Sequence, residues 1–167
     1  MLKELRKWLF LVTIVFTVAL FSRSIMGNNA LVKKQTKSLE KILTKEIEFD
    51  KDSTEGKVKD LILLDYDKMY VFGPYEPVDK MEKQIGFKFS ALKQGISEGT
   101  NNILFIKKNK EVAYLFGYPS NSGYYIDIET GEYTKDQVDK MTYLIKKGEV
   151  GNSSGPEQKY NYYEFRN

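Results

Sequence analysis

The longest apolar run of the chain lies near its N-terminus, from Trp8 to Phe21. Lys3, Arg6 and Lys7 precede this run. A basic segment before an apolar run is typical of signal peptides and N-terminal membrane anchors, whose basic end stays in the cytoplasm. The pattern predicts a membrane anchor formed by Trp8, Leu9, Phe10, Leu11, Val12, Ile14, Val15, Phe16, Val18, Leu20 and Phe21.

The fate of this segment depends on the residues that follow it. The run is roughly 14 residues long, whereas a full span takes about 20. If the apolar segment continues to Met26, it is close to the length of a membrane span. The long side chain of Arg23 could then reach the membrane–water interface. Neither Ser22 with Ser24 nor Ile25 with Gly27 is a clean Ala-x-Ala cleavage site. The sequence favours an uncleaved signal anchor over residues 1–27. A secreted protein after signal cleavage is the alternative, and a buried helix is a third reading.

Residues 28–57 are predicted to form a tether and an amphipathic helix. Leu39, Ile42, Leu43 and Ile47 are spaced for one helical face, with Lys and Glu residues opposite. The polar segment DKDSTEGK, residues 50–57, is predicted to break the helix before the next element.

Residues 58–148 are predicted to be one antiparallel α+β domain, built from short strands and helices. A strand region is expected over residues 58–72, and a helix over residues 78–85 that Gly86 would close. The clearest element is a hairpin of residues 102–107 and 111–118, with Asn109 in its turn. Residues 124–128 alternate like a third strand, and residues 129–132 are expected to turn.

The C-terminal part begins with a predicted capping box, Thr134 with Gln137. The helix that it opens would place Val138, Met141 and Ile145 on one face and end near Gly148. Residues 149–167 would then be a flexible linker followed by a tail or an edge strand.

Composition narrows the possible functions. The chain has 41% hydrophobic and 29% charged residues, as an ordinary globular protein does. Its net charge of +3 comes from interspersed acids and bases, so the sequence gives no indication of nucleic-acid binding. It has no cysteine, which excludes a lipidated cysteine, and no histidine, the commonest general base and metal ligand. We therefore expect no cofactor and no metal site.

Short catalytic motifs lack their necessary partners. Residues 95–99 match the nucleophile pattern G-x-S-x-G, but the chain offers no histidine as base. Two S-x-x-K patterns, at residues 38–41 and 90–93, stand without the companion motifs of serine acyl-transferases. The start of a calcium loop at residues 50–55 has Glu55 where glycine is needed. We assign no catalytic residue, although the abundant carboxylates leave a hydrolase open.

The sequence DYDKMYVFGPY, residues 65–75, resembles a phrase found in small, uncharacterised exported proteins of Gram-positive bacteria. Those proteins are membrane-anchored or lipoprotein-like. They often carry Trp where Tyr66 stands, and many use a lipidated cysteine that is missing here. The resemblance implies an exported domain and provides no catalytic residue.

Aromatic residues are the one compositional excess, at 14% of the chain. Tyrosine suits both sheet packing and recognition surfaces. Core and sheet packing would account for most tyrosines, while a binding face is predicted near the two Pro-containing turns, formed by Tyr75, Tyr118, Tyr124 and Tyr125.

These patterns together predict a cell-membrane protein with a single span, its N-terminus cytoplasmic and its domain extracytoplasmic. We expect a non-enzymatic binding or accessory protein of unknown ligand. Its partners would be the membrane, through the N-terminal helix, and a protein or cell-envelope component. The alternatives are a small carboxylate-dependent envelope hydrolase and a purely structural envelope component.

Overall fold

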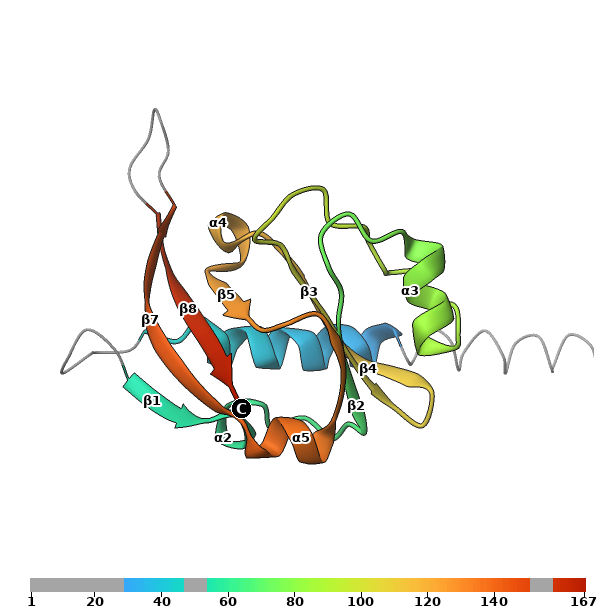
Figure 1. Ribbon diagram of the computed structural model, residues 1–167, viewed down its shortest axis with the longest axis horizontal. Coiled ribbons are helices and arrows are strands. Elements are labelled where there is room, and N and C mark those ends of the chain that lie inside the picture. Colours follow the sequence, from blue (N-terminus) through green and yellow to red (C-terminus); the bar gives the residue numbers. More distant parts are fainter. Residues whose placement is uncertain (1–28, 47–53, 151–157) are drawn as a thin grey trace, which may run out of the picture.

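Two four-stranded sheets form the folded part of the chain (Figure 1). The computed structural model describes residues 29–46, 54–150 and 158–167. Over these residues the fold is α+β, as predicted, with sheets that are mostly antiparallel and short helices around them.

The first sheet has the order β4-β3-β2-β6 and is antiparallel throughout. Its centre is the predicted hairpin, observed as β3 (Asn101–Lys107) and β4 (Lys110–Gly117). Lys108 and Asn109 in the turn have positive φ angles of 49° and 57°, as a two-residue hairpin turn requires. β2 (Lys68–Val71) lies between β3 and β6 (Gly131–Thr134).

The second sheet has the order β1-β7-β8-β5. β7 (Thr142–Val150) pairs antiparallel with β1 (Thr54–Lys57) and with β8 (Gln158–Arg166). β8 pairs in parallel with β5 (Tyr124–Asp127). The C-terminal strand is therefore interior to its sheet.

Apolar residues of β3 enter both cores of the molecule. Ile103 and Phe105 belong to a cluster shared with the second sheet. Leu104 and Ile106 belong to the other cluster, with Met81 of the helix α3 (Val78–Ile85). The first sheet is covered on both faces, and this explains the nearly continuous apolar run of β3.

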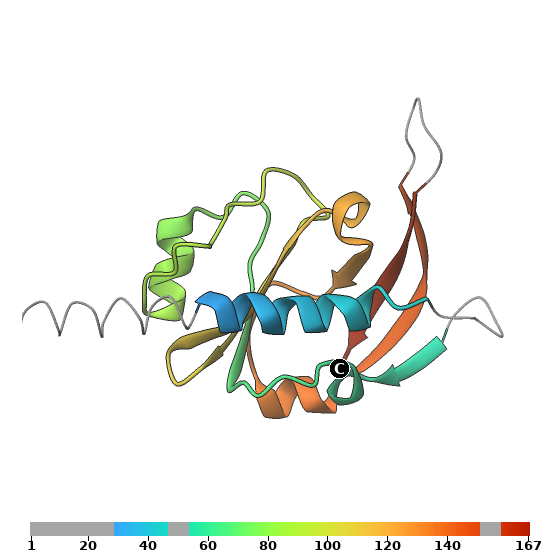
Figure 2. The ribbon, with the colours of Figure 1, turned by 180° about the vertical axis from the view of Figure 1, so that it is seen from behind.

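A helix over residues 29–43 lies across the molecule (Figure 2). Its buried side carries Val32, Leu39 and Leu43, and the predicted Ile47 lies outside the described residues. The Thr36 hydroxyl accepts a hydrogen bond of 3.0 Å from the backbone N–H of Tyr114 in β4. The helix thereby covers an edge strand that would otherwise expose unpaired backbone groups.

Two asparagines hold the second sheet to its neighbours. The Asn161 amide in β8 donates to the carbonyls of Leu43 and Lys45, at 2.8 and 3.0 Å, and so caps the helix of residues 29–43. The buried Asn101 amide donates to the Tyr124 carbonyl at 3.0 Å and accepts from the Ile126 N–H at 3.0 Å. Asn101 therefore joins the first sheet directly to β5 of the second.

Local sequence signals predicted two helical features correctly. α3 has the predicted bounds, and Gly86 closes it in the left-handed conformation, with φ 82°. The Thr134 capping box opens α5 (Lys135–Lys140), with both reciprocal hydrogen bonds present. α4 (Pro119–Ser122) follows β4 as a single turn.

The strand predicted over residues 58–72 is mostly wrong. Residues 58–61 form α2 (Val58–Leu61), which buries Val58 and Leu61 one turn apart, and only residues 68–71 are a strand. The turn expected at residues 129–132 is shorter than predicted, because Gly131 and Glu132 begin β6 and pair with Val71 and Tyr70 of β2.

The helix predicted to reach Gly148 is also wrong. α5 ends at Lys140, Met141 is extended with ψ 148°, and β7 follows. Ile145 still enters the core, but from a strand. The predicted domain boundary at residue 148 lies inside β7, which continues to Val150. The predicted C-terminal edge strand is instead β8, which lies in the interior of its sheet. Residues 151–156 of the predicted linker lie outside the described residues.

In the described part of the chain, no helix has the length and apolar character needed to cross a membrane. The predicted anchor, residues 8–21, lies outside that part.

Replacing Asn101 by Ala should lower the free energy of unfolding by roughly 2–4 kcal/mol, because two backbone groups of β5 lose their buried partner. Urea unfolding followed by circular dichroism measures the change. Asn121→Ala, at an exposed position in α4, is the control and should change stability by less than about 0.5 kcal/mol. Equal stabilities of the two variants would show that the Asn101 bridge is unimportant.

Candidate binding rim

Four large side chains gather around the loop of residues 94–100, which precedes β3. We call Tyr75, Ile96, Tyr118 and Tyr125 the tyrosine rim. Tyr75 is 55% exposed and Ile96 is 75% exposed. Their segments are joined because the Tyr75 N–H donates to the Gly95 carbonyl at 2.8 Å. Two large apolar side chains thus lie in solvent on adjoining, hydrogen-bonded backbones.

Tyr75 is held in an uncommon backbone conformation. Its φ of 65° is left-handed, which is rare for a bulky residue. Gln94 Nε2 donates to the Tyr75 carbonyl at 3.0 Å, so the loop fixes the residue on both its N–H and its C=O. The neighbouring Glu76 accepts from the Gly73 N–H and from Gln84. Such strain is found where the surroundings determine the conformation, often at functional sites.

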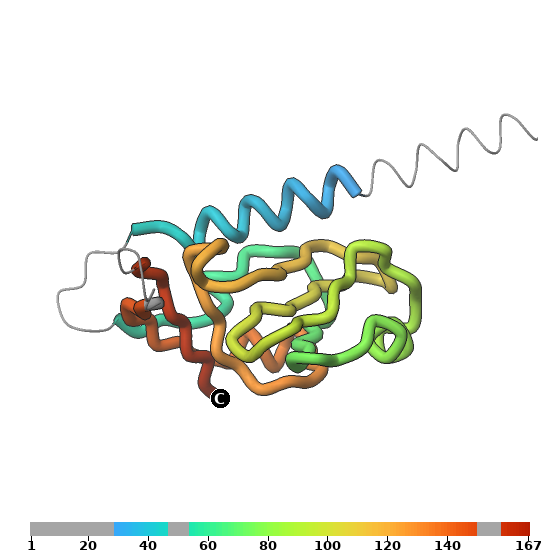
Figure 3. The backbone as a smooth tube through the Cα atoms, turned by 90° about the horizontal axis from the view of Figure 1, so that it is seen from above, coloured from blue at the N-terminus to red at the C-terminus, as the bar shows by residue number. Residues whose placement is uncertain are grey.

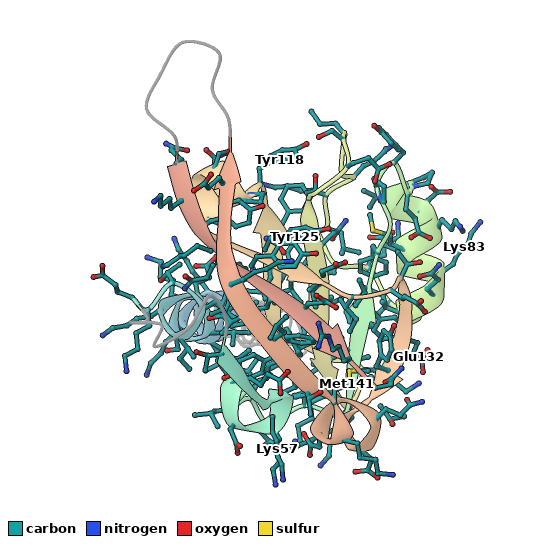
Figure 4. The ribbon with its side chains drawn as sticks, turned by 60° about the vertical axis from the view of Figure 1, so that its left-hand side comes forward. Lys57, Lys83, Tyr118, Tyr125, Glu132 and Met141 are labelled. Carbon is teal, nitrogen blue, oxygen red and sulfur yellow. The ribbon has the colours of Figure 1, made fainter. Side chains whose placement is uncertain are left out.

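Tyr118 leaves β4 and reaches the same loop (Figure 4). Hydrogen bonding to the Ser97 hydroxyl, and then to that of Thr100, holds the pKa of the Tyr118 phenol below its usual value. Thr100 Oγ1 in turn donates to the Ser97 carbonyl at 2.8 Å. The loop that contains the G-x-S-x-G match is therefore closed on itself, and Ser97 serves as part of that closure.

Tyr125 points outward from β5 and is half-buried against the second sheet (Figure 4). Its ring centroid lies 5.7 Å from that of Tyr162, its register partner on β8. Burial, followed by the negative charges of Asp127 and Glu98, raises the pKa of the Tyr125 phenol. The Tyr162 hydroxyl donates to Asp127, and Lys146 lies over the Tyr162 ring at 4.6 Å. Tyr125 is thus packed into a polar and aromatic cluster.

The prediction of Tyr124 as a binding residue is wrong. Its side chain is 0% exposed and belongs to the core between the sheets. The reason is the two-residue period of β5, which turns Tyr124 and Ile126 inward and Tyr125 and Asp127 outward. The Tyr124 hydroxyl has no hydrogen-bond partner among the described residues, and burial raises its pKa.

The sequence pattern did not single out Ile96 as a site residue. The signal available was an isolated large aliphatic residue between glycine and serine, in an otherwise polar loop. Loop residues of this kind are often explained by recognition, because nothing in the loop can bury them.

The hollows of the molecule differ in size and place. Beside the rim, a cavity of about 70 Å³ is lined by residues that include Pro74, Glu98, Thr100 and Tyr125. This is far smaller than the roughly 300–1,000 Å³ of small-molecule sites. A groove of about 370 Å³ lies elsewhere, between the helix of residues 29–43 and the segment 89–91, with Glu40 and Tyr114 in its lining. The rim itself therefore favours surface contact over enclosure of a small molecule.

The described residues contain no group of three or more acidic side chains placed to hold a metal ion. Comparisons with protein-family models, curated proteins and solved structures find no match to this chain. The assignment of the site therefore depends on its own geometry.

Tyr118 should ionise at a lower pH than the tyrosines whose phenols are buried, because hydrogen bonds to its oxygen favour the phenolate. An alkaline titration followed by tyrosinate absorbance should show an early component that Tyr118→Phe removes. Tyr125→Phe, which deletes a phenol of raised pKa, should leave that component unchanged. Retention of the early component in Tyr118→Phe would contradict the described loop geometry.

Proposed function

We propose that this protein is a membrane-anchored, extracytoplasmic binding protein without enzymatic activity, and that the tyrosine rim contacts a partner protein. One observation carries the proposal. Tyr75 and Ile96 expose large side chains to solvent, and hydrogen bonds join the two backbone segments that carry them.

The chemistry of the rim matches that of protein interfaces. Aromatic side chains provide much of the contact energy in such interfaces, and tyrosine combines a large apolar area with a polar tip. A binding surface that is ordered before contact also loses less conformational entropy on association. The hydrogen bonds at Tyr75 and the loop closure at Ser97 and Thr100 provide that order.

The membrane attachment is proposed from the sequence of residues 1–27. The basic residues at positions 3, 6 and 7 and the apolar run that follows would direct the chain into a membrane with its N-terminus cytoplasmic. The folded part would then lie outside the cytoplasm, where the rim is available to a partner in the envelope.

A photo-crosslinking residue placed at Ile96 tests the rim in the cells that make the protein. We expect a crosslinked species of defined size, because the Ile96 side chain would face the partner. Adding Tyr75→Ala should reduce its yield severalfold, as removal of an aromatic contact does in an interface. The yield is read by immunoblotting of an epitope-tagged chain.

Leu63 provides the matched control. It is 71% exposed and follows α2, at the opposite end of the molecule from α4, which comes directly after Tyr118 (Figure 1). The same crosslinker at Leu63 should give no such species. Identical products from positions 96 and 63, or a yield that Tyr75→Ala leaves unchanged, would exclude the rim as the binding surface.

A further inference from the structure

The outer face of the helix over residues 29–43 carries charge of one sign. Lys33, Lys34, Lys37 and Lys41 are exposed there and, with Ala30 and Ser38, line one shallow surface. We call these four residues the lysine face. Lys33, Lys37 and Lys41 follow each other at four-residue intervals, so they form a row along the helix.

This face lies opposite the side that holds the helix to the domain. Val32, Leu39 and Leu43 are buried on the inner side, half a turn away from the lysine row. Leu31, 52% exposed, flanks the lysines. The helix is therefore amphipathic, with its apolar side already covered and its basic side in solvent.

Few acids lie near the lysine face. Glu40, the one acidic residue among positions 29–43, lines the groove on the flank together with Lys33 and Lys37, and its carboxylate interacts electrostatically with Lys37. One carboxylate does not balance four lysines. No ion pair within 4.0 Å involves any of the four lysines in the described part of the chain. Other lysines do form such pairs, as Lys68 does with Glu132, Lys107 with Asp65 and Lys135 with Asp139.

The place of this helix in the chain brings it close to a membrane. The apolar run of the predicted anchor ends at Phe21, so residues 22–28 separate that run from the helix, and a segment of that length spans at most about 25 Å. If the anchor continues to Met26, the separation is shorter still. Gly27 and Asn28 in this segment are residue types that turns favour. An attached domain cannot move its lysine face far from the headgroups.

We propose that the helix of residues 29–43 lies along the membrane surface, with the lysine face against anionic lipid headgroups. This inference depends on the proposed membrane attachment and adds an orientation to it. Lysines near an anionic leaflet are attracted to it over about a Debye length, about 8 Å at physiological salt. Their long stems allow the ammonium groups to reach headgroups, and Leu31 adds apolar contact at the interface.

The orientation decides which parts of the molecule face away from the lipid. The helix runs along one side of the molecule, and the two sheets and α3 lie to its other side (Figure 3). With the helix on the membrane, these elements point away from it, toward the space outside the lipid.

The absence of cysteine makes a direct test possible, since any introduced cysteine is the only one. The full chain carrying Ser38→Cys is labelled with a fluorescent dye and reconstituted into vesicles that contain headgroup-quencher lipid. The vesicles are phosphatidylcholine with or without phosphatidylglycerol. We expect much stronger quenching with phosphatidylglycerol, weakened by added salt. Asp136→Cys, exposed on α5, is the matched label position and should stay weakly quenched.

Charge removal and flotation complete the test. Replacing the four lysines by Gln should reduce the quenching at position 38 to that at position 136. Equal quenching at both positions, or quenching that the Gln variant retains, would overturn the proposal. A third result would also overturn the proposal. If position 38 is never quenched and the Gln variant loses the Ile96 crosslink, the lysines contact a protein partner and not lipid. A chain that fails to float with vesicles contradicts the anchor itself, whereas a floating but unquenched chain contradicts only the orientation.

Discussion

The amide of Asn101 is the interaction on which the arrangement of the two sheets depends. It pairs with the Tyr124 carbonyl and the Ile126 N–H, as a neighbouring strand would. The side chain is buried, so a missing partner would leave polar groups without water. Asn101 begins β3 directly after the loop that carries Ile96, and β5 carries Tyr125. One amide therefore fixes the rim residues of the first sheet relative to those of the second.

Elements specified by adjacent residues could be predicted from the sequence. The turn at Lys108 and Asn109, the glycine that closes α3 and the capping box at Thr134 each depend on contacts within a few residues. Elements specified by distant partners could not. The position of Ile145 in the sequence is compatible with both a helical and a strand periodicity. Its pairing with Thr54 of β1 and Tyr163 of β8 makes it part of a strand. β8 pairs with β5, a strand far from it in the sequence, which no local pattern shows.

The candidate site also could be predicted only in part, because local sequence does not show which face of a strand is buried. The structure brings Tyr75, Tyr118 and Tyr125 next to residues of the loop 94–100, and their role in binding stays a prediction. Tyr124 differs from Tyr125 by one residue, and in a strand that difference exchanges core for surface. Most other tyrosines serve the sheets and cores, as the stacked pairs Tyr70–Phe72 and Tyr114–Phe116 show. Their abundance therefore says little about recognition, whereas the exposed pair Tyr75 and Ile96 is informative.

The rim and the lysine face belong to different elements and would serve different partners, one a protein and the other the lipid surface. Both proposals require the folded part of the chain to be attached outside the cytoplasm. Fractionation of the tagged full-length protein, combined with protease treatment of intact cells, tests this requirement most directly. We expect the chain to stay with membranes at full length and external protease to digest its folded part. A soluble chain that is protected inside intact cells would contradict it.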